Sequence, residues 1–161
     1  MVRRNERGFS LVEVVIALGL LAGVLIAIAG LFIIGGKQVK SGRTSSEALA
    51  LAREIQEEMN GFGYTQLWSY FGYNGEATTY TVDTRTNAAC TAWQNTLRTK
   101  LGNSAYANIK LDSVTNAAGT TTNFADAGGN ILAKTVRVAV TVNWTELPGR
   151  PRFVTVGTTN N

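Results

Sequence analysis

The chain has 161 residues, which is enough for one domain of ordinary size and too few for two substantial ones. Apolar residues make up 45% of it and charged residues 16%, so the chain can bury a core. It contains no histidine and one cysteine, Cys90, which removes the commonest general base and any internal disulfide or multi-thiolate metal site. We therefore predict a protein that is not an enzyme and has no catalytic residue, metal site or cofactor.

The formal net charge of +4 is less informative than where the charges lie. Arg3, Arg4 and Arg7 fall within the first seven residues, while the other lysines and arginines are scattered singly along the chain. A protein that follows a phosphate backbone usually carries a basic stripe or patch. The sequence therefore predicts no direct binding to nucleic acid.

An apolar segment follows this basic start. From Val14 to Gly36 there are 23 consecutive residues without a charge, and Lys37 and Lys40 come next. A helix of that length is about 34 Å long, which is enough to cross a hydrocarbon core of roughly 30 Å. The arginines favour a cytoplasmic N-terminus and place the C-terminal bulk outside, although the two lysines weaken this preference.

Glu13 lies near the start of this apolar segment. A carboxylate inside a membrane helix costs on the order of 2.5–3.5 kcal/mol at mid-membrane, and less near an end, so it usually has a partner. Cleavage after Gly8 would give Phe9 a free ammonium group, which could pair with Glu13 of a neighbouring copy and fix the stagger of two helices. The alternative is a carboxylate that simply lies among the lipid headgroups.

The block from Gly8 to Ala17 resembles the class III signal of type IV pilins and pseudopilins. The resemblance covers residues 1 to about 36. It implies that a prepilin peptidase cuts after Gly8 and methylates the new N-terminus at Phe9, and it places the family's glutamate on Glu13. It also implies partners: other pilins through the N-terminal helix, the peptidase, and an inner-membrane assembly platform driven by a separate ATPase.

Two other interpretations of the N-terminus stay open. An ordinary secretory signal could end at Ala27-Ile28-Ala29, although its apolar stretch would be unusually long and would contain Glu13. A generic single-pass anchor explains the length of the segment but neither Gly8-Phe9 nor Glu13. Gly19 and Gly23 form a G-x-x-x-G pair, which is a weak signal for close helix packing in lipid.

The helix is predicted to continue to Asn60-Gly61, which is a stop signal. Ala48, Ala52, Ile55 and Met59 fall on one face of this continuation, with glutamates mostly on the rest of its surface. A helix over residues 9–60 would be weakest at its glycines, which are Gly35, Gly36 and Gly42. The stripe of small and apolar residues needs a partner, and we predict that this partner is a sheet.

The C-terminal half alternates as a sheet does. Val136, Val138, Val140, Val142 and Trp144 alternate with more polar residues, a turn follows at residues 146–151, and Val154 and Val156 begin a second strand. Shorter strands are predicted at 79–84 and 107–115, with a short amphipathic helix starting near Asn87. The order resembles the α+β pilin fold, and the ending is similar to minor pilins of the PilV kind and to the pseudopilin I subunit.

Three further segments of the head have a structural and a functional interpretation. Residues 62–73 hold six aromatic residues, for which core packing is favoured over a contact surface. Residues 116–130 are rich in Gly, Asn, Thr and Ala, which is typical of a surface loop. Cys90 is expected to be a buried, inert thiol.

The predicted organisation is a leader over 1–8, a transmembrane and assembly helix over 9–36, an amphipathic continuation over 37–60, and a globular head over 61–161 with an αβ-loop and an antiparallel sheet. The predicted function is that of a minor type IV pilin, held in the bacterial inner membrane and then part of a pilus. The missing helix-kinking proline argues against a major subunit, and a head of about 100 residues favours the minor pilin slightly over a type II secretion pseudopilin in a periplasmic pseudopilus. A second alternative is a membrane-anchored envelope binding domain that never polymerises.

Overall fold

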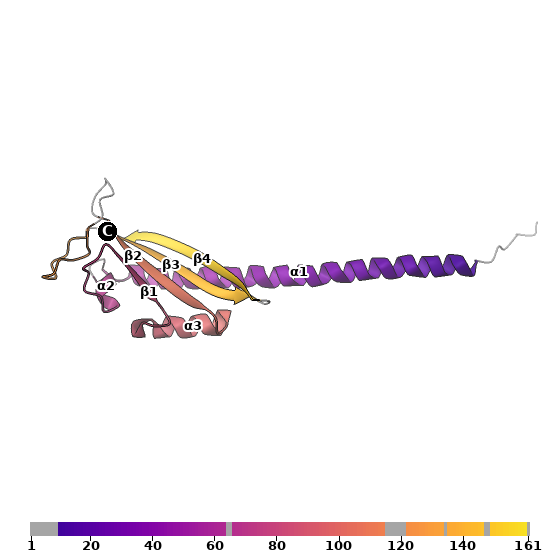
Figure 1. The fold of residues 1–161 in the computed structure, drawn as a ribbon, viewed down its shortest axis with the longest axis horizontal. Coiled ribbons are helices and arrows are strands. Elements are labelled where there is room, and N and C mark those ends of the chain that lie inside the picture. Colours follow the sequence, from indigo (N-terminus) through magenta and orange to yellow (C-terminus); the bar gives the residue numbers. More distant parts are fainter. Residues whose placement is uncertain (1–9, 64–65, 115–121, 134, 147–148, 161) are drawn as a thin grey trace, which may run out of the picture. The chain divides into compact units, whose positions relative to one another are not determined.

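The computed structural model describes residues 10–63, 66–114, 122–133, 135–146 and 149–160 (Figure 1). The chain divides into two compact units, Met1–Gly42 and Arg43–Asn161. The first unit consists, in its described part, of Ser10 and most of the length of one helix. The second unit, which we call the head, contains the rest of that helix and every other element.

Helix α1 extends over Leu11–Asn60. It begins after Ser10, whose carbonyl oxygen accepts hydrogen bonds from the backbone N–H groups of Glu13 (2.9 Å) and Val14 (3.2 Å). It ends where Gly61 donates its backbone N–H to the carbonyl oxygens of Glu57 and Glu58. The predicted single helix and its stop at Asn60-Gly61 are therefore confirmed, and Gly35, Gly36 and Gly42 lie inside the helix.

Four antiparallel strands form one sheet in the order β1-β2-β3-β4 (Figure 1). Their bounds are Thr79–Asp83, Tyr106–Val114, Thr135–Glu146 and Arg150–Asn160. The predicted strands are confirmed, and β3 and β4 extend further into the turn between them than the sequence indicated. The α+β fold, a long apolar helix packed on an antiparallel sheet, is the one predicted.

The core of the head lies between α1 and the inner face of the sheet. Ala48, Leu51, Ala52, Ile55 and Met59 form the buried stripe of α1. They pack in one cluster with every second residue of the central strands: Ala107, Ile109 and Leu111 of β2, and Val136, Val138, Val140, Val142 and Trp144 of β3. Burial of each large apolar side chain stabilises the head by about 1.5–3 kcal/mol, which is why the period-two pattern fixes the register.

The predicted amphipathic helix is present between β1 and β2. A 3-10 turn, η1 (Ala88–Cys90), leads into α3 (Thr91–Leu101). The side chain of Asn87 caps η1 by accepting a hydrogen bond from the backbone N–H of Ala89 at 3.0 Å. Trp93, Leu97 and Leu101 are buried against the core, and Gly102 ends the helix with a positive φ of 99°.

The aromatic segment after α1 contributes mainly to the core, as predicted. It includes the short helix α2 (Leu67–Tyr70). Trp68 and Phe71 are buried, whereas Phe62 and Tyr73 are partly buried against the core cluster. Tyr64 lies outside the described residues. Tyr70 has an exposed fraction of 38%, which is the highest among the described aromatic residues of this segment.

The prediction of a surface loop over 116–130 is wrong at Phe124. Residues 115–121 lie outside the described part, but Phe124 has no exposed surface and stacks on Trp68 with ring centroids 5.2 Å apart. Gly75 permits this packing, because a Cβ atom there would lie 2.9 Å from Trp68 Nε1 and 3.0 Å from Ala125 Cβ. Phe124, an aromatic residue in a polar segment, thus anchors that segment to the core of the head.

Candidate functional site

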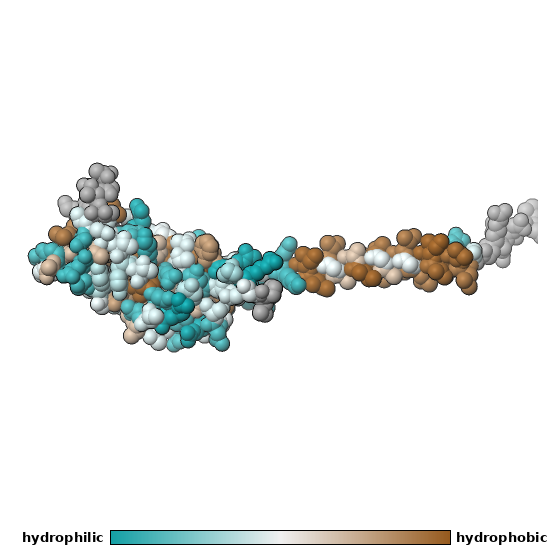
Figure 2. Space-filling view, viewed as in Figure 1, coloured by the Kyte–Doolittle hydropathy of each residue, from teal (hydrophilic) through white to brown (hydrophobic). Residues whose placement is uncertain are grey.

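The described part of the first unit, residues 10–42, contains no buried residue. Residues 14–36 carry no charge on any side of the helix. Figure 2 shows one side of this segment, where brown apolar residues are interrupted by pale patches. Large side chains such as Leu11, Ile26 and Phe32 keep 80%, 74% and 77% of their surface exposed. A helix that is apolar all round is stable only when something outside it covers that surface.

The extent of this surface indicates what can cover it. Soluble monomers rarely expose contiguous apolar patches larger than a few hundred Å², and larger patches mark membrane or protein contacts. Among the described residues, α1 is the one helix long and apolar enough to cross a membrane. The predicted membrane helix therefore has the length, the composition and the exposure that such a segment needs.

Glu13 lies in the first turn of α1 and is exposed. A carboxylate at this position interacts favourably with the positive end of the helix dipole. Within the described part of the chain, no lysine or arginine comes within ion-pair distance of it. Gly8 and Phe9, the residues of the predicted cleavage and methylation, lie outside the described residues, so the Phe9–Glu13 pairing stays a prediction.

Gly19 and Gly23 lie one helical turn apart on the same side of α1. A Cβ atom added at either position would meet no atom of the described residues within 4 Å. The chain itself therefore gives no reason for two residues without side chains here. Their predicted role in close packing against another helix remains a prediction, because no second helix is present to test it.

Cys90 is fully buried in the core of the head, as expected. Burial raises the pKa of its thiol to about 11, with a smaller contribution from the charge of Asp83. A thiol that stays protonated at neutral pH is a poor nucleophile and a poor metal ligand. Among the residues that the structure describes, no group of three or more His, Cys, Asp or Glu side chains is arranged to hold a metal ion.

A contact that the sequence did not indicate ties α3 to α1. The indole N–H of Trp93 donates a hydrogen bond to the Glu58 carboxylate at 2.6 Å. Periodicity assigns Trp93 to the core and Glu58 to the surface, so neither residue signals the pairing by itself. The indole of Trp93 is mostly buried, and this bond gives its N–H group an acceptor at the rim of the core.

The comparisons with known proteins bear on the N-terminal segment alone. Residues 3–35 match the family model described as the prokaryotic N-terminal methylation motif. Neither a curated protein nor a solved structure matches the chain. The match covers Gly8, Phe9 and Glu13 together with most of the exposed apolar surface of α1. The chain therefore carries a prokaryotic N-terminal methylation motif, which is consistent with the predicted resemblance to type IV pilins and pseudopilins.

Proposed function

We propose that the protein is a minor type IV pilin, a structural subunit that takes part in pilus assembly after its leader is removed. The single observation that carries the proposal is the coincidence of the methylation motif over residues 3–35 with a helix whose apolar surface is uncovered. A signal for removal of a basic leader and a helix that needs an external partner are the two features a helical filament subunit requires.

The proposed mechanism begins with processing. The leader, residues 1–8, holds the N-terminus in the cytoplasm, and a prepilin peptidase cleaves after Gly8 and methylates Phe9. Residues 9–36 then store the subunit in the inner membrane, with residues 37–60 as the amphipathic continuation. Residues 61–161, which form most of the head, lie outside the cytoplasm. Other pilins and an inner-membrane assembly platform are the partners of this stage.

Assembly follows from the charge at Glu13. In a membrane, the carboxylate of one subunit attracts the Phe9 ammonium group of a neighbour, and the pair offsets the cost of keeping either charge in lipid. The exposed apolar side chains of α1 then exchange lipid contacts for contacts with neighbouring helices, and Gly19 and Gly23 allow close approach. The filament thereby gains a fixed stagger between subunits.

The first experiment is to determine the N-terminal residue and the mass of the mature, membrane-bound protein. The proposal expects a chain that starts at N-methylated Phe9. A chain that starts at Gly30 would identify a secreted soluble protein, and a chain that retains Arg3 and Arg4 would identify a simple membrane anchor. Either of those results would remove the basis for the mechanism.

Glu13→Ala tests the pairing itself. We expect at least about a tenfold loss of the subunit from sheared filaments, because a gap of about 1.4 kcal/mol per docking step already shifts an equilibrium tenfold. Glu57→Ala is the matched control, since Glu57 is an exposed glutamate of the same helix in the head. Normal incorporation of the Glu13→Ala variant would show that the pairing is wrong.

A type II secretion pseudopilin is the alternative, because the resemblance of the N-terminal segment extends to pilins and pseudopilins alike. Deletion of the protein separates them. Loss of surface pili, or of functions that depend on pili, supports the pilin. A secretion defect with normal pili identifies the pseudopilin.

A further inference from the structure

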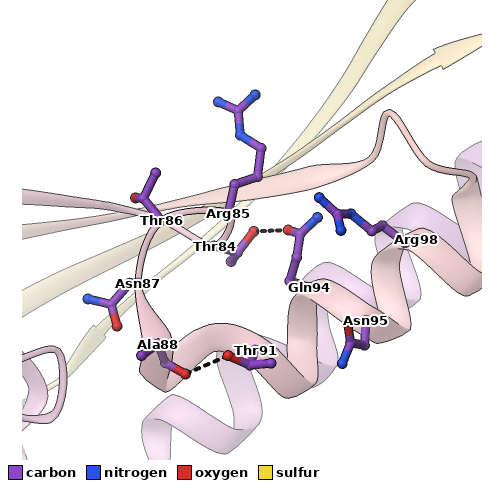
Figure 3. Close-up of a pocket in the computed structure, with 9 residues that line it drawn as sticks. All are labelled: Thr84, Arg85, Thr86, Asn87, Ala88, Thr91, Gln94, Asn95 and Arg98. Atoms are coloured by element: carbon purple, nitrogen blue, oxygen red, sulfur yellow. Dashed lines mark hydrogen bonds between the residues drawn. The ribbon is translucent and has the colours of Figure 1, made fainter.

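The head has a polar cavity of about 270 Å³ between the end of β1 and helix α3. This cavity has no part in the proposed assembly mechanism, which resides in the N-terminal helix. Figure 3 shows the residues that line it: Thr84, Arg85, Thr86, Asn87, Ala88, Thr91, Gln94, Asn95 and Arg98. All of these residues except Ala88 are polar or charged.

The floor of the cavity is held in place by buried hydrogen bonds. Thr84 and Gln94 are buried, and the Thr84 hydroxyl donates to Gln94 Oε1 at 2.5 Å. Gln94 Nε2 donates to the carbonyl oxygen of Ala105 at 2.9 Å, and the backbone N–H of Ala107 donates to Thr84 Oγ1 at 2.9 Å. These bonds connect β1, α3 and β2, so the cavity has its shape before any ligand arrives.

The two arginines of the cavity differ in what they contact. Arg85 forms an ion pair with Asp83, with Nε 3.0 Å from Oδ1, and its guanidinium carbon lies 3.7 Å from the ring centroid of Tyr106. Arg98 has no side-chain hydrogen bond or ion pair to any residue that the structure describes. Figure 3 shows its guanidinium group extending back along α3 toward Gln94.

The remaining donors and acceptors define the ligand chemistry. No carboxylate lines the cavity, so the charge of Arg98 is available to an anion. Thr86 and Thr91 each donate their only hydroxyl proton to the backbone, to Asp83 O at 3.2 Å and to Ala88 O at 2.7 Å. Their oxygens therefore keep lone pairs that can accept hydrogen bonds from hydroxyl groups of a ligand.

We propose that this cavity binds a small hydroxylated carboxylate of the sugar-acid class, with Arg98 holding the carboxylate and Thr86 and Thr91 accepting bonds from its hydroxyls. A cavity of about 270 Å³ lies just below the range of about 300–1,000 Å³ found for drug-sized ligands, which suits a single six-membered sugar ring. The same chemistry occurs in a free sugar acid and at the end of an acidic polysaccharide.

The test uses the full chain in detergent micelles and titrates it with galacturonate, galactose or acetate, followed by calorimetry and by amide chemical shifts. We expect galacturonate to bind at least about tenfold more tightly than galactose, which lacks the carboxylate, and than acetate, which lacks the hydroxyls. Shifts should centre on residues 84–98. A short oligogalacturonate separates the sources, because stronger binding than the monomer indicates a polysaccharide ligand and weaker binding indicates a free sugar acid.

Variants of α3 assign the effect. Arg98→Gln should weaken galacturonate binding by about tenfold or more and leave the amide spectrum of the head dispersed, whereas Arg98→Lys should retain part of the affinity. Lys100→Gln is the matched control, because it removes an equal charge from the same helix without touching the cavity. The proposal would be overturned if galacturonate does not bind, or if galactose or acetate binds as tightly as galacturonate. It would also be overturned if Arg98→Gln and Lys100→Gln lose equal affinity for galacturonate.

Discussion

The two parts of helix α1 share one backbone geometry and differ in everything that surrounds it. Residues 11–42 contain no buried residue and include 23 consecutive uncharged residues from Val14 to Gly36, whereas residues 43–60 are apolar along one stripe and bury six residues. The difference shows that apolar content alone does not predict a core. A core forms where polar residues on the opposite face define which side turns inward, and an all-round apolar surface instead requires a membrane or another helix.

The strongest test of this difference separates the two units. A chain of residues 43–161 contains the whole core cluster and should form a folded, soluble monomer in buffer without detergent. The full chain should need detergent, because its first unit exposes the apolar surface. Sedimentation velocity and circular dichroism measure both properties. Aggregation or loss of structure in the shorter chain would show that the head depends on residues 1–42.

A second test compares side chains in different surroundings. Phe124→Ala should lower the free energy of unfolding of the head by about 3–5 kcal/mol, because it leaves a cavity beside Trp68. Phe153→Ala, at a phenylalanine with 72% exposure, and Leu25→Ala in the first unit should each change it by less than about 0.5 kcal/mol. Urea unfolding followed by tryptophan fluorescence gives the values. A small loss for Phe124→Ala would mean that the residue does not anchor its loop.

Cys90 gives a chemical measure of how closed the core of the head is. With a pKa raised to about 11 and no exposed surface, the thiol should resist iodoacetamide at pH 7–8 and react quickly once the head is unfolded in urea. Mass spectrometry of the alkylated protein follows the reaction. Rapid alkylation of the folded protein would show that the region around α3 opens frequently.

The smallest expected effect concerns Asp83. Its hydrogen bond and ion pair with Arg85 lower the pKa of the carboxyl group, so the contribution to stability is present above the unfolded pKa of about 3.9 and is lost as the pH falls through the lower folded value. Asp83→Asn should therefore cost about 0.2–1 kcal/mol near pH 7 and progressively less as the pH falls below about 3.9. Urea midpoints of both proteins across pH 2–7 test this, and a loss that is equal at all pH values would exclude the ion pair as its source.

Most of the fold follows from the sequence because its elements have strong periodic patterns. The valine alternation of β3, the stripe of α1 and the Asn87 cap each indicate their own element. Phe124 could not be assigned in the same way, because a single aromatic residue in a polar segment has no period, and only the approach of Trp68 and Gly75 shows that it is buried.

The N-terminal site was predictable to a different degree. Glu13 could be named from its position at the start of an apolar segment, and Gly8 and Phe9 through the resemblance to the class III signal, although the pairing of Phe9 with Glu13 requires a second copy. The cavity at α3 was not predictable. Arg98 and Asn95 have a spacing that places them on one exposed face, but only the packing of β1, α3 and β2 makes that face concave.

The order of the core along the chain has a consequence for biosynthesis. The stripe of α1 is synthesised first. Strands β2 and β3, which cover it, are synthesised late, and only β4 follows them. Until residues 106–146 have been made, most of the sheet that covers the stripe is missing, so the chain passes through a stage in which both parts of α1 expose apolar surface. Contacts between such distant segments close slowly. Chaperones or lipid contacts would act on this stage, and loss of the hairpin formed by β3 and β4 would make it permanent.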